Sequence, residues 1–299
     1  MTRRNTPRIS FIGFGEAGQA IASGLREGGI EQIAAWDILF PEASGAKLKA
    51  AADKFGVRAA TSAADAVAET DMVISAVTAA SSLEAARSVE PHLKGNPYYL
   101  DINSVSPGRK QDTEKLLGGK ARYVDVAVIA PIHPKRHQTP LLIAGPHADA
   151  VTPLLDELDM KLSIVPGGTG KAAAIKMIRS VMIKGMEALT LECFLAASRA
   201  DLLEEVTKSL KNNYPTLDWT AIADYNIERM ASHGERRAAE MEESSVTLKE
   251  LGMEPLMVDA TVKRQREMGA LGKHEQVRET LHDGRAAMLK AIGTAKDQR

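Results

Sequence analysis

This 299-residue sequence predicts a doubly wound α/β domain followed by an all-helical domain. Three observations support that fold class. Short runs of β-branched residues alternate with Ala-rich segments through the first half of the chain, as they do in repeated βαβ units. A glycine-rich turn joins the first of these runs to a helical segment. After Pro166-Gly167-Gly168 the β-branched runs stop and helix-favouring residues dominate, so we place the two domains at residues 1–167 and 168–299.

Seven short runs are expected to form a mostly parallel sheet, because each is rich in β-branched or aromatic residues or is bounded by turn residues. They are residues 8–12, 32–36, 72–77, 98–102, 123–127, 141–144 and 161–165. The segments between them, such as 15–28 and 43–55, are long enough for the crossover helices that parallel strands require.

The second domain is expected to begin with a helix from about residue 170 to residue 197. Apolar residues recur there at helical spacing, at Ile175, Ile178, Met182, Met186 and Leu189. Because the segment is apolar around most of its circumference, we expect this helix to be buried on more than one side.

Composition excludes several classes of protein. The chain has 38 Lys plus Arg against 39 Asp plus Glu, so its net charge of -1 gives no overall attraction to nucleic acid or to anionic lipid. Cys193 is the only cysteine, which rules out an intramolecular disulfide, and no Cys or His spacing typical of a metal site occurs. The N-terminal residues lack the features of a signal peptide, and no apolar run approaches the ~20 residues that span a bilayer. We expect a cytoplasmic protein without metal, membrane or nucleic-acid partners.

The glycine-rich turn is Gly13-Phe14-Gly15-Glu16-Ala17-Gly18, directly after the first predicted strand. In such a sequence the first glycine allows a tight turn, the second lets the backbone approach a pyrophosphate, and the third lets the helix pack on the strand. The helix N-terminus supplies N–H groups and partial positive charge to the phosphates. A structural turn without a ligand is the alternative interpretation. We expect a dinucleotide to contact Gly13, Phe14, Gly15, Glu16 and Ala17.

Asp37 ends the second predicted strand, about twenty residues after the glycine-rich turn. A carboxylate there accepts both ribose hydroxyls of NAD and repels the 2′-phosphate of NADP. No Arg or Lys follows in residues 38–41. NAD is therefore the expected cofactor and NADP the less favoured one, although a solvated loop acid is the alternative interpretation of Asp37. Val77 and Thr78, where the third predicted strand ends, are expected as further cofactor contacts.

With these motifs in place, the chain resembles the β-hydroxyacid dehydrogenase family, which includes 3-hydroxyisobutyrate and 6-phosphogluconate dehydrogenases. The resemblance covers about residues 8–190 in four ordered segments. Segment 13–22 matches the family's glycine-rich opening without its two methionines. Segment 101–107 is similar to Asp-x-Ser-Thr-x-x-Pro, segment 125–131 partly matches Asp-Ala-Pro-Val-Ser-Gly-Gly, and segment 170–180 is similar to Gly-x-Gly-x-x-x-Lys-x-x-x-Asn. From about residue 195 the chain resembles the helical domain of a less-studied branch.

The resemblance implies that Lys176 is the catalytic residue. Oxidation of an alcohol by hydride transfer needs a group that takes the hydroxyl proton, and a lysine does so where burial and a nearby positive nicotinamide lower its pKa. Lys176 lies in an apolar helical stretch, where an unused ammonium would be costly, although a surface lysine on the helix edge is the alternative. Ser104 is expected near both nicotinamide and substrate. Ser180, which stands where the family has Asn, is either a substrate contact or a plain helical serine.

The loop that holds the substrate carboxylate in the family departs from the family pattern here. Ile129-Ala130-Pro131 replaces Ser-Gly-Gly, which removes a hydroxyl and, at Pro131, an N–H donor. Ile129 and Ala130 therefore favour a bulkier or less polar acyl group, or a carboxylate held elsewhere. His233 and Arg237 in the helical domain are candidates for that role, with a solvated charged face as the alternative. A second candidate, equally consistent with a solvent-facing loop, is the basic group His133, Lys135, Arg136 and His137.

The sequence thus favours an NAD-dependent dehydrogenase acting on a 3-hydroxy acid or a related compound, paired as a homodimer through its helical domain as the resemblance implies. An imine reductase on the same scaffold is one alternative, against which Lys176 argues because those relatives generally replace the lysine. A non-catalytic dinucleotide sensor or interaction module is the other. Such a module would keep the glycine-rich turn without needing a buried base.

Overall fold

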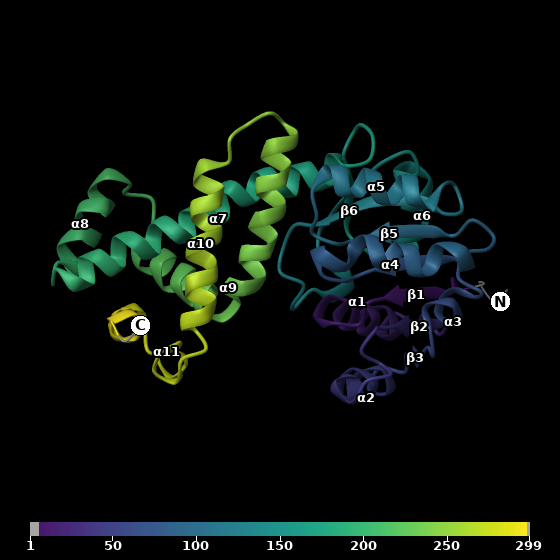
Figure 1. Cartoon of the computed structure of the whole chain (residues 1–299), viewed down its shortest axis with the longest axis horizontal. Coiled ribbons are helices and arrows are strands. Elements are labelled where there is room, and N and C mark those ends of the chain that lie inside the picture. Colours follow the sequence, from purple (N-terminus) through teal and green to yellow (C-terminus); the bar gives the residue numbers. More distant parts are fainter. Residues whose placement is uncertain (1–5, 298–299) are drawn as a thin grey trace. The chain divides into compact units, whose positions relative to one another are not determined.

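The computed structural model describes residues 6–297 and divides into two compact units, the first ending at Lys176 and the second beginning at Met177 (Figure 1). The division falls inside helix α7 (Lys171–Arg199), later than the expected boundary between residues 167 and 168. Composition changes where the last strand ends, but the first turn of α7 is still hydrogen-bonded to a strand of the first unit.

The first unit contains an eight-stranded sheet in the order β3-β2-β1-β4-β5-β6-β7-β8. Every neighbouring pair is parallel except β6 and β7, so the mostly parallel sheet is confirmed. The strands are β1 (Ile9–Ile12), β2 (Ile33–Trp36), β3 (Arg58–Ala59), β4 (Met72–Ser75), β5 (Tyr98–Asp101), β6 (Arg122–Val128), β7 (Leu141–Ala144) and β8 (Leu162–Ile164). Strand β3 was not expected, because two residues are too few to show an alternating pattern.

Helices cover both faces of this sheet, because successive side chains of its strands alternate between two apolar cores. Phe11 and Ile74 belong to the core that includes residues of α1, α2 and α6, whereas Ile12 and Val73 belong to the core of α3, α4 and α5. The helices are α1 (Glu16–Glu27), α2 (Ala46–Lys54), α3 (Ala63–Val67), α4 (Ser82–Val89), α5 (Pro107–Leu117) and α6 (Ala148–Glu157), with short 3-10 turns η1 (Ala43–Gly45), η2 (Ala79–Ser81), η3 (Glu90–His92) and η4 (Arg136–Gln138).

The order in which the chain adds strands to the sheet reverses at β1. The chain leaves β1 through α1 to reach β2 on one side, and later places β4 on the other side of β1. Loops at the carboxyl ends of β1 and β4 therefore diverge, and ligands of doubly wound proteins bind in the crevice that such divergence leaves. The expected cofactor residues Gly13 and Val77 both lie at this edge.

The second unit is helical and consists of the rest of α7 with α8 (Leu203–Asn213), α9 (Trp219–Glu250), α10 (Leu256–Leu271), α11 (Glu275–Glu279) and α12 (Arg285–Asp297). Helices α9 and α10 touch through their backbones, since a β-carbon at Gly234 would lie only 2.4 Å from the backbone nitrogen of Gly269. Glycine at both positions lets the two helices approach this closely. Between residues 6 and 297 no helix is both long and apolar enough to cross a membrane.

One apolar face of α7 remains exposed in the second unit. Met182 is 66% exposed and Leu189 59%, and Ile178 and Met186 lie on the same face. The expectation that this helix is buried on more than one side was therefore wrong within a single chain. The buried part of α7 carries polar residues instead, among them Lys184 and Glu187, which pair with charged residues of α9.

Candidate active site

The glycine-rich turn follows β1 and is shaped by main-chain contacts. Gly13 has a φ of +90°, and a β-carbon there would lie 2.4 Å from the carbonyl oxygen of Ala76. A β-carbon at Gly18 would lie 2.6 Å from the carbonyl oxygen of Gly13, so the third glycine lets α1 approach the turn. At Gly15, in contrast, a β-carbon would meet nothing within 4 Å. This open space is what the close approach of a pyrophosphate requires.

The N-terminus of α1 adjoins that open space. Gly15 precedes the helix and provides no side-chain cap, and helix N-termini of this kind commonly bind phosphate groups. Glu16 is exposed and Ala17 half-buried at this end of the helix. Phe14 differs from its neighbours, because its ring is buried against Phe11 and Phe40. Of the residues expected to contact the cofactor, Phe14 therefore offers backbone atoms only.

Asp37 lies beside the glycine-rich turn. Its Oδ2 accepts a hydrogen bond from the N–H of Phe14 at 2.8 Å, and its Oδ1 accepts one from the N–H of Leu39 at 3.0 Å. A carboxylate has about four acceptor positions, so these two bonds orient Asp37 without using all of its capacity. The next side chain, Ile38, is 73% exposed and brings no positive charge to the site.

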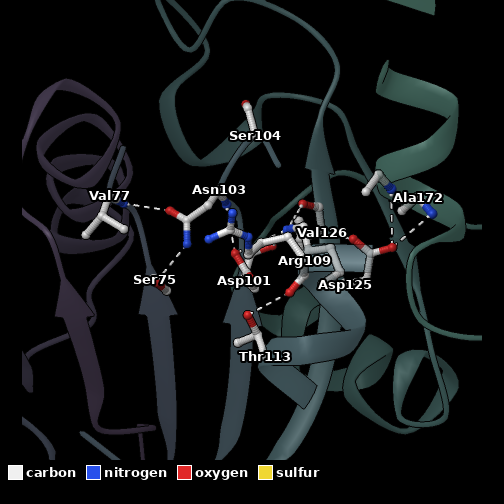
Figure 2. Close-up of polar contacts among 12 residues, drawn as sticks. Ser75, Val77, Asp101, Asn103, Ser104, Arg109, Thr113, Asp125, Val126 and Ala172 are labelled. Carbon is white, nitrogen blue, oxygen red and sulfur yellow. Dashed lines mark hydrogen bonds and ion pairs between the residues drawn. The ribbon is translucent and has the colours of Figure 1, made fainter. Parts of the chain in front are cut away.

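Asn103 joins the loops after β4 and β5, and sequence reasoning did not assign it a role. Its Oδ1 accepts from the N–H of Val77 at 2.7 Å, and its Nδ2 donates to the Ser75 hydroxyl at 2.9 Å (Figure 2). Val77 also borders the glycine-rich turn, since a β-carbon at Gly13 would lie 2.6 Å from its Cγ1. Thr78 is exposed, and its hydroxyl donates to that of Ser81. The sequence feature that could have pointed to Asn103 is its position in segment 101–107, where the family pattern has Ser.

Ser104 and Lys176 lie together within the first unit. The Lys176 ammonium donates to the Ser104 hydroxyl oxygen at 2.5 Å, and both side chains are half-buried. Figure 2 shows Ser104 pointing away from the buried polar network around Asp101. The structure thus brings together the two residues to which the resemblance gave roles in the reaction, and Ser104 directly follows Asn103 in the chain.

A buried group of charges, which we call the charged triad, consists of Asp101, Lys110 and Asp125. The Lys110 ammonium lies 3.1 Å from Oδ1 of Asp101 and 3.7 Å from Oδ1 of Asp125. All three side chains are buried, and buried charges are tolerated when they are paired in this way. Burial raises the pKa of Asp125, and the nearby Lys110 opposes that rise. Sequence reasoning missed the triad, because Lys110 lies in no motif.

The loop after β6 gives little support for carboxylate binding. Ile129 and Ala130 are half-buried, and the N–H of Ile129 donates to the carbonyl of Pro140 at 3.2 Å. The basic residues that follow this loop either pair with other residues of the chain, are partly buried or are exposed to solvent. Arg136 makes two hydrogen bonds of 2.6 Å to Glu27, burial lowers the pKa of His137, and His133 and Lys135 are exposed. Within residues 6–297 no cluster of three or more His, Cys, Asp or Glu could hold a metal ion.

Two of the candidate substrate residues of the second half of the chain, Ser180 and Arg237, are buried in polar contacts and do not lie on a solvated face. Arg237 is buried, and its guanidinium donates twice to Glu187, with the Nε bond at 2.8 Å. Ser180 is also buried and accepts from Lys184, which pairs with Glu240 at 2.8 Å. His233 is half-buried on α9. Sequence reasoning did not foresee the pairing of Arg237, whose charge is balanced inside this unit.

Fold and site together define a class of protein, those with the dinucleotide-binding Rossmann-type fold of oxidoreductases. Residues 8–103 match the family model described as NADP oxidoreductase, coenzyme F420-dependent. Residues 197–268 match a domain of unknown function, DUF1932. The second match lies in the helical unit and is consistent with a less-studied branch.

Solved structures narrow the class. A conserved hypothetical protein from Sinorhizobium meliloti 1021 is 35% identical over 97% of both chains, with a TM-score of 0.77. Conserved protein MTH1747, described as structurally similar to 3-hydroxyacid dehydrogenases, is 30% identical over 88% of this chain and 97% of its own, with a TM-score of 0.69. The 3-hydroxyisobutyrate dehydrogenase of Mycobacterium tuberculosis shares the fold at 16% identity, with a TM-score of 0.72 over 97% of this chain and 99% of its own. The chain belongs to the β-hydroxyacid dehydrogenase family, as its sequence segments predicted.

Proposed function

We propose that the protein is an NAD-dependent dehydrogenase that moves a hydride between a 3-hydroxy acid, or a related β-hydroxy compound, and nicotinamide. One observation carries this proposal. The Lys176 ammonium is bonded to Ser104 at 2.5 Å, and the neighbouring Asn103 is bonded to Val77, which borders the glycine-rich turn. A proton-transferring group is thereby linked through Ser104, Asn103 and Val77 to the glycine-rich turn.

In this reaction the bound nicotinamide supplies the hydride acceptor or donor. Lys176 takes the hydroxyl proton of the substrate during oxidation and returns a proton to the carbonyl oxygen during reduction. Ser104 accepts a hydrogen bond from Lys176, so its own O–H is directed to a further acceptor such as the substrate oxygen. Gly13, Gly15 and the start of α1 hold the pyrophosphate, and Asp37 receives the ribose hydroxyls.

The substrate is proposed to carry a bulky or weakly polar acyl group. The N–H of Ile129 is bonded within the protein and Pro131 has none, so this loop offers few donors to a carboxylate. Ile129 and Ala130 instead offer apolar surface. We propose that aryl- or alkyl-substituted 3-hydroxy compounds are turned over faster than small hydroxy acids, which a panel scored by NADH absorbance measures.

Replacement of Lys176 tests the assigned chemistry. Lys176→Ala is expected to lower turnover at least about a hundredfold, the usual contribution of a general base, while NAD binding persists. Lys171→Ala is the matched control, because Lys171 is an exposed lysine in the first turn of the same helix. Unchanged turnover in Lys176→Ala contradicts the proposal. Turnover of imines but not of alcohols would favour the imine reductase, and NAD binding without any turnover would favour the sensor.

We also propose that the protein forms a homodimer through its helical unit. The exposed apolar face of α7, with Met182 and Leu189, is the support for this arrangement, because apolar side chains in such a stripe are commonly covered in an oligomer. Met182→Lys with Leu189→Lys is expected to give a monomer in sedimentation experiments. The control is Leu251→Lys, at a residue 58% exposed elsewhere in the same unit.

A further inference from the structure

The start of α7 is held by a carboxylate from another element. Asp125 on β6 accepts hydrogen bonds through its Oδ2 from the N–H groups of Gly170 and Ala172, both at 3.0 Å, and of Ala173 at 3.2 Å. Figure 2 shows the bond from Ala172. The first N–H groups of a helix have no partner within the helix and carry partial positive charge. One buried carboxylate therefore fastens the first turn of α7 to the sheet, one turn before Lys176.

The other oxygen of Asp125 faces Lys110. The Lys110 ammonium donates to the backbone carbonyls of Asp101 at 2.5 Å and of Val126 at 3.3 Å, in addition to its ion pairs with the two carboxylates. An ammonium has three protons to donate, and all its partners here belong to the end of β5 and the middle of β6. Lys110 thus ties these two strands together beneath the site.

The Asp101 carboxylate holds the other side of the site. Its Oδ1 accepts from the N–H of Asn103 at 3.0 Å, and its Oδ2 accepts from the Tyr123 hydroxyl at 2.8 Å. This fixes the backbone one residue before Ser104. The two partners of the Lys176–Ser104 hydrogen bond are therefore each fixed by a different carboxylate of the charged triad, and Lys110 joins the two carboxylates.

We propose that Asp125, linked through Lys110 to Asp101, is a positioning residue that holds Lys176 against Ser104. The inference rests on the proposed function in that it takes Lys176 as the proton-transferring group. Hydrogen bonds to an ionised acceptor are roughly twice as strong as neutral ones, so three of them restrain the helix turn firmly. Such restraint matters because a misplacement of about 1 Å can lower the rate of a reaction about a hundredfold.

Two substitutions remove the hydrogen bonds between Asp125 and the start of α7 to different extents. Asp125→Asn removes the charge but keeps one oxygen that accepts N–H groups, whereas Asp125→Ala removes the acceptor. Lys110 keeps Asp101 as its counter-ion in both variants, so no buried charge loses every partner. We expect hydrogen exchange at the amides of Ala172 and Ala173 to accelerate about tenfold in Asp125→Asn and further in Asp125→Ala.

Lys176 itself provides the second readout. Its labelling by an amine-reactive reagent, measured by mass spectrometry relative to Lys171, is expected to accelerate in both variants because the amine leaves Ser104. Turnover is expected to fall about tenfold or more while the Kd of NAD is unchanged. Asp65→Asn is the matched control. Asp65 accepts from the N–H of Thr61 at 2.7 Å and pairs with Arg58, so its loss lowers thermal stability without changing the labelling of Lys176.

The outcomes separate this inference from the proposed function. Amide exchange and Lys176 labelling that equal those of the wild type in Asp125→Asn overturn the positioning role. Neither measurement needs a substrate, so a wild-type protein that binds no dinucleotide contradicts the proposed function and leaves this test intact. Should Asp125→Ala fail to fold, Asp125→Asn decides the question alone.

Discussion

The two parts of the site in the first unit are built on different principles. The glycine-rich turn is shaped by main-chain contacts over a few residues, with Gly13 against Ala76 and Gly18 against Gly13. The Lys176–Ser104 contact depends instead on buried side chains from three elements, the charged triad. A turn that is shaped by close backbone contacts is sensitive to an added β-carbon. A contact that is held by buried ion pairs is sensitive to the loss of one charged side chain. The difference also decides which part a sequence can reveal.

The largest effect is expected at the residue that joins the two parts. Asn103→Ala leaves the N–H of Val77 without its acceptor and the hydroxyl of Ser75 without its donor. We expect turnover to fall about a hundredfold and the affinity for NAD about tenfold, because loops on both sides lose a shared anchor. Calorimetric titration and steady-state kinetics measure the two losses. Ser81→Ala, which removes only an exposed bond to Thr78, is the control, and full NAD affinity in Asn103→Ala would show that the two parts are independent.

Substitution of Gly13 and of Gly29 by alanine tests whether close backbone contacts shape the glycine-rich turn. Gly13 and Gly29 have nearly the same φ, +90° and +92°, but only Gly13 has backbone within contact distance of a β-carbon. Gly29→Ala is expected to lower the free energy of unfolding by about 1 kcal/mol through backbone strain alone, with NAD affinity intact. Gly13→Ala is expected to lower it by about 1–3 kcal/mol and NAD affinity about tenfold. Equal effects of the two substitutions in denaturant unfolding and titration would contradict the close approach at Gly13.

Cofactor choice provides a smaller test of the turn. Ile38→Arg places a guanidinium on an exposed position next to Asp37, where it can pair with a 2′-phosphate. The ratio of kcat/KM for NAD to that for NADP is expected to fall about fivefold, and Ile38→Gln, which adds no charge, is expected to leave the ratio near its original value. A wild-type protein that already prefers NADP would show that Asp37 does not act on the ribose as proposed.

The smallest effect is expected at the exposed ion pair of Arg8 and Asp71. Its contribution to the free energy of unfolding can be compared with that of the buried charged triad. Hydrogen bonds from Arg8 hold the pKa of Asp71 below the ordinary value of 3.8. The carboxylate therefore stabilises the fold above pH 3.8, and that contribution is lost as the pH falls through the lower pKa of the folded state. Because both side chains are more than a third exposed, the loss is at most about 0.5 kcal/mol. Acid unfolding curves of Asp71→Asn and wild type are expected to converge once the pH falls below the lowered pKa of Asp71.

Much of the fold follows from local sequence patterns. The runs at 72–77 and 98–102 contain β4 and β5, because a parallel strand buried on both faces is mostly apolar or aromatic. Strand β3 was missed because two residues carry no periodicity. The compact units divide at residue 176 and not at the change in composition after residue 167, because Asp125 holds the first turn of α7 to the first unit.

The same distinction applies to the site. Gly13, Gly15 and Asp37 are found in the sequence because their spacing is itself the signal. Lys176 and Ser104 were found only by resemblance, since they lie 72 residues apart. The side chains of Asn103, Lys110 and Asp125 bond to residues between 9 and 48 positions away, and no short sequence pattern includes both partners. Arg237 illustrates the limit, because its carboxylate partner Glu187 lies 50 residues earlier.

The crossing of α9 and α10 decides how the helical unit responds to change. Where Gly234 meets Gly269, no rotamer can absorb an added methyl group, so an alanine at either position must push the helices apart. Arg237 and Gln265 sit one turn from that crossing, and both reach Glu187 from their own helices. A single extra carbon at either glycine would thus move the Arg237 guanidinium and the Gln265 amide away from Glu187. The ion pair would weaken although the added carbon does not contact it.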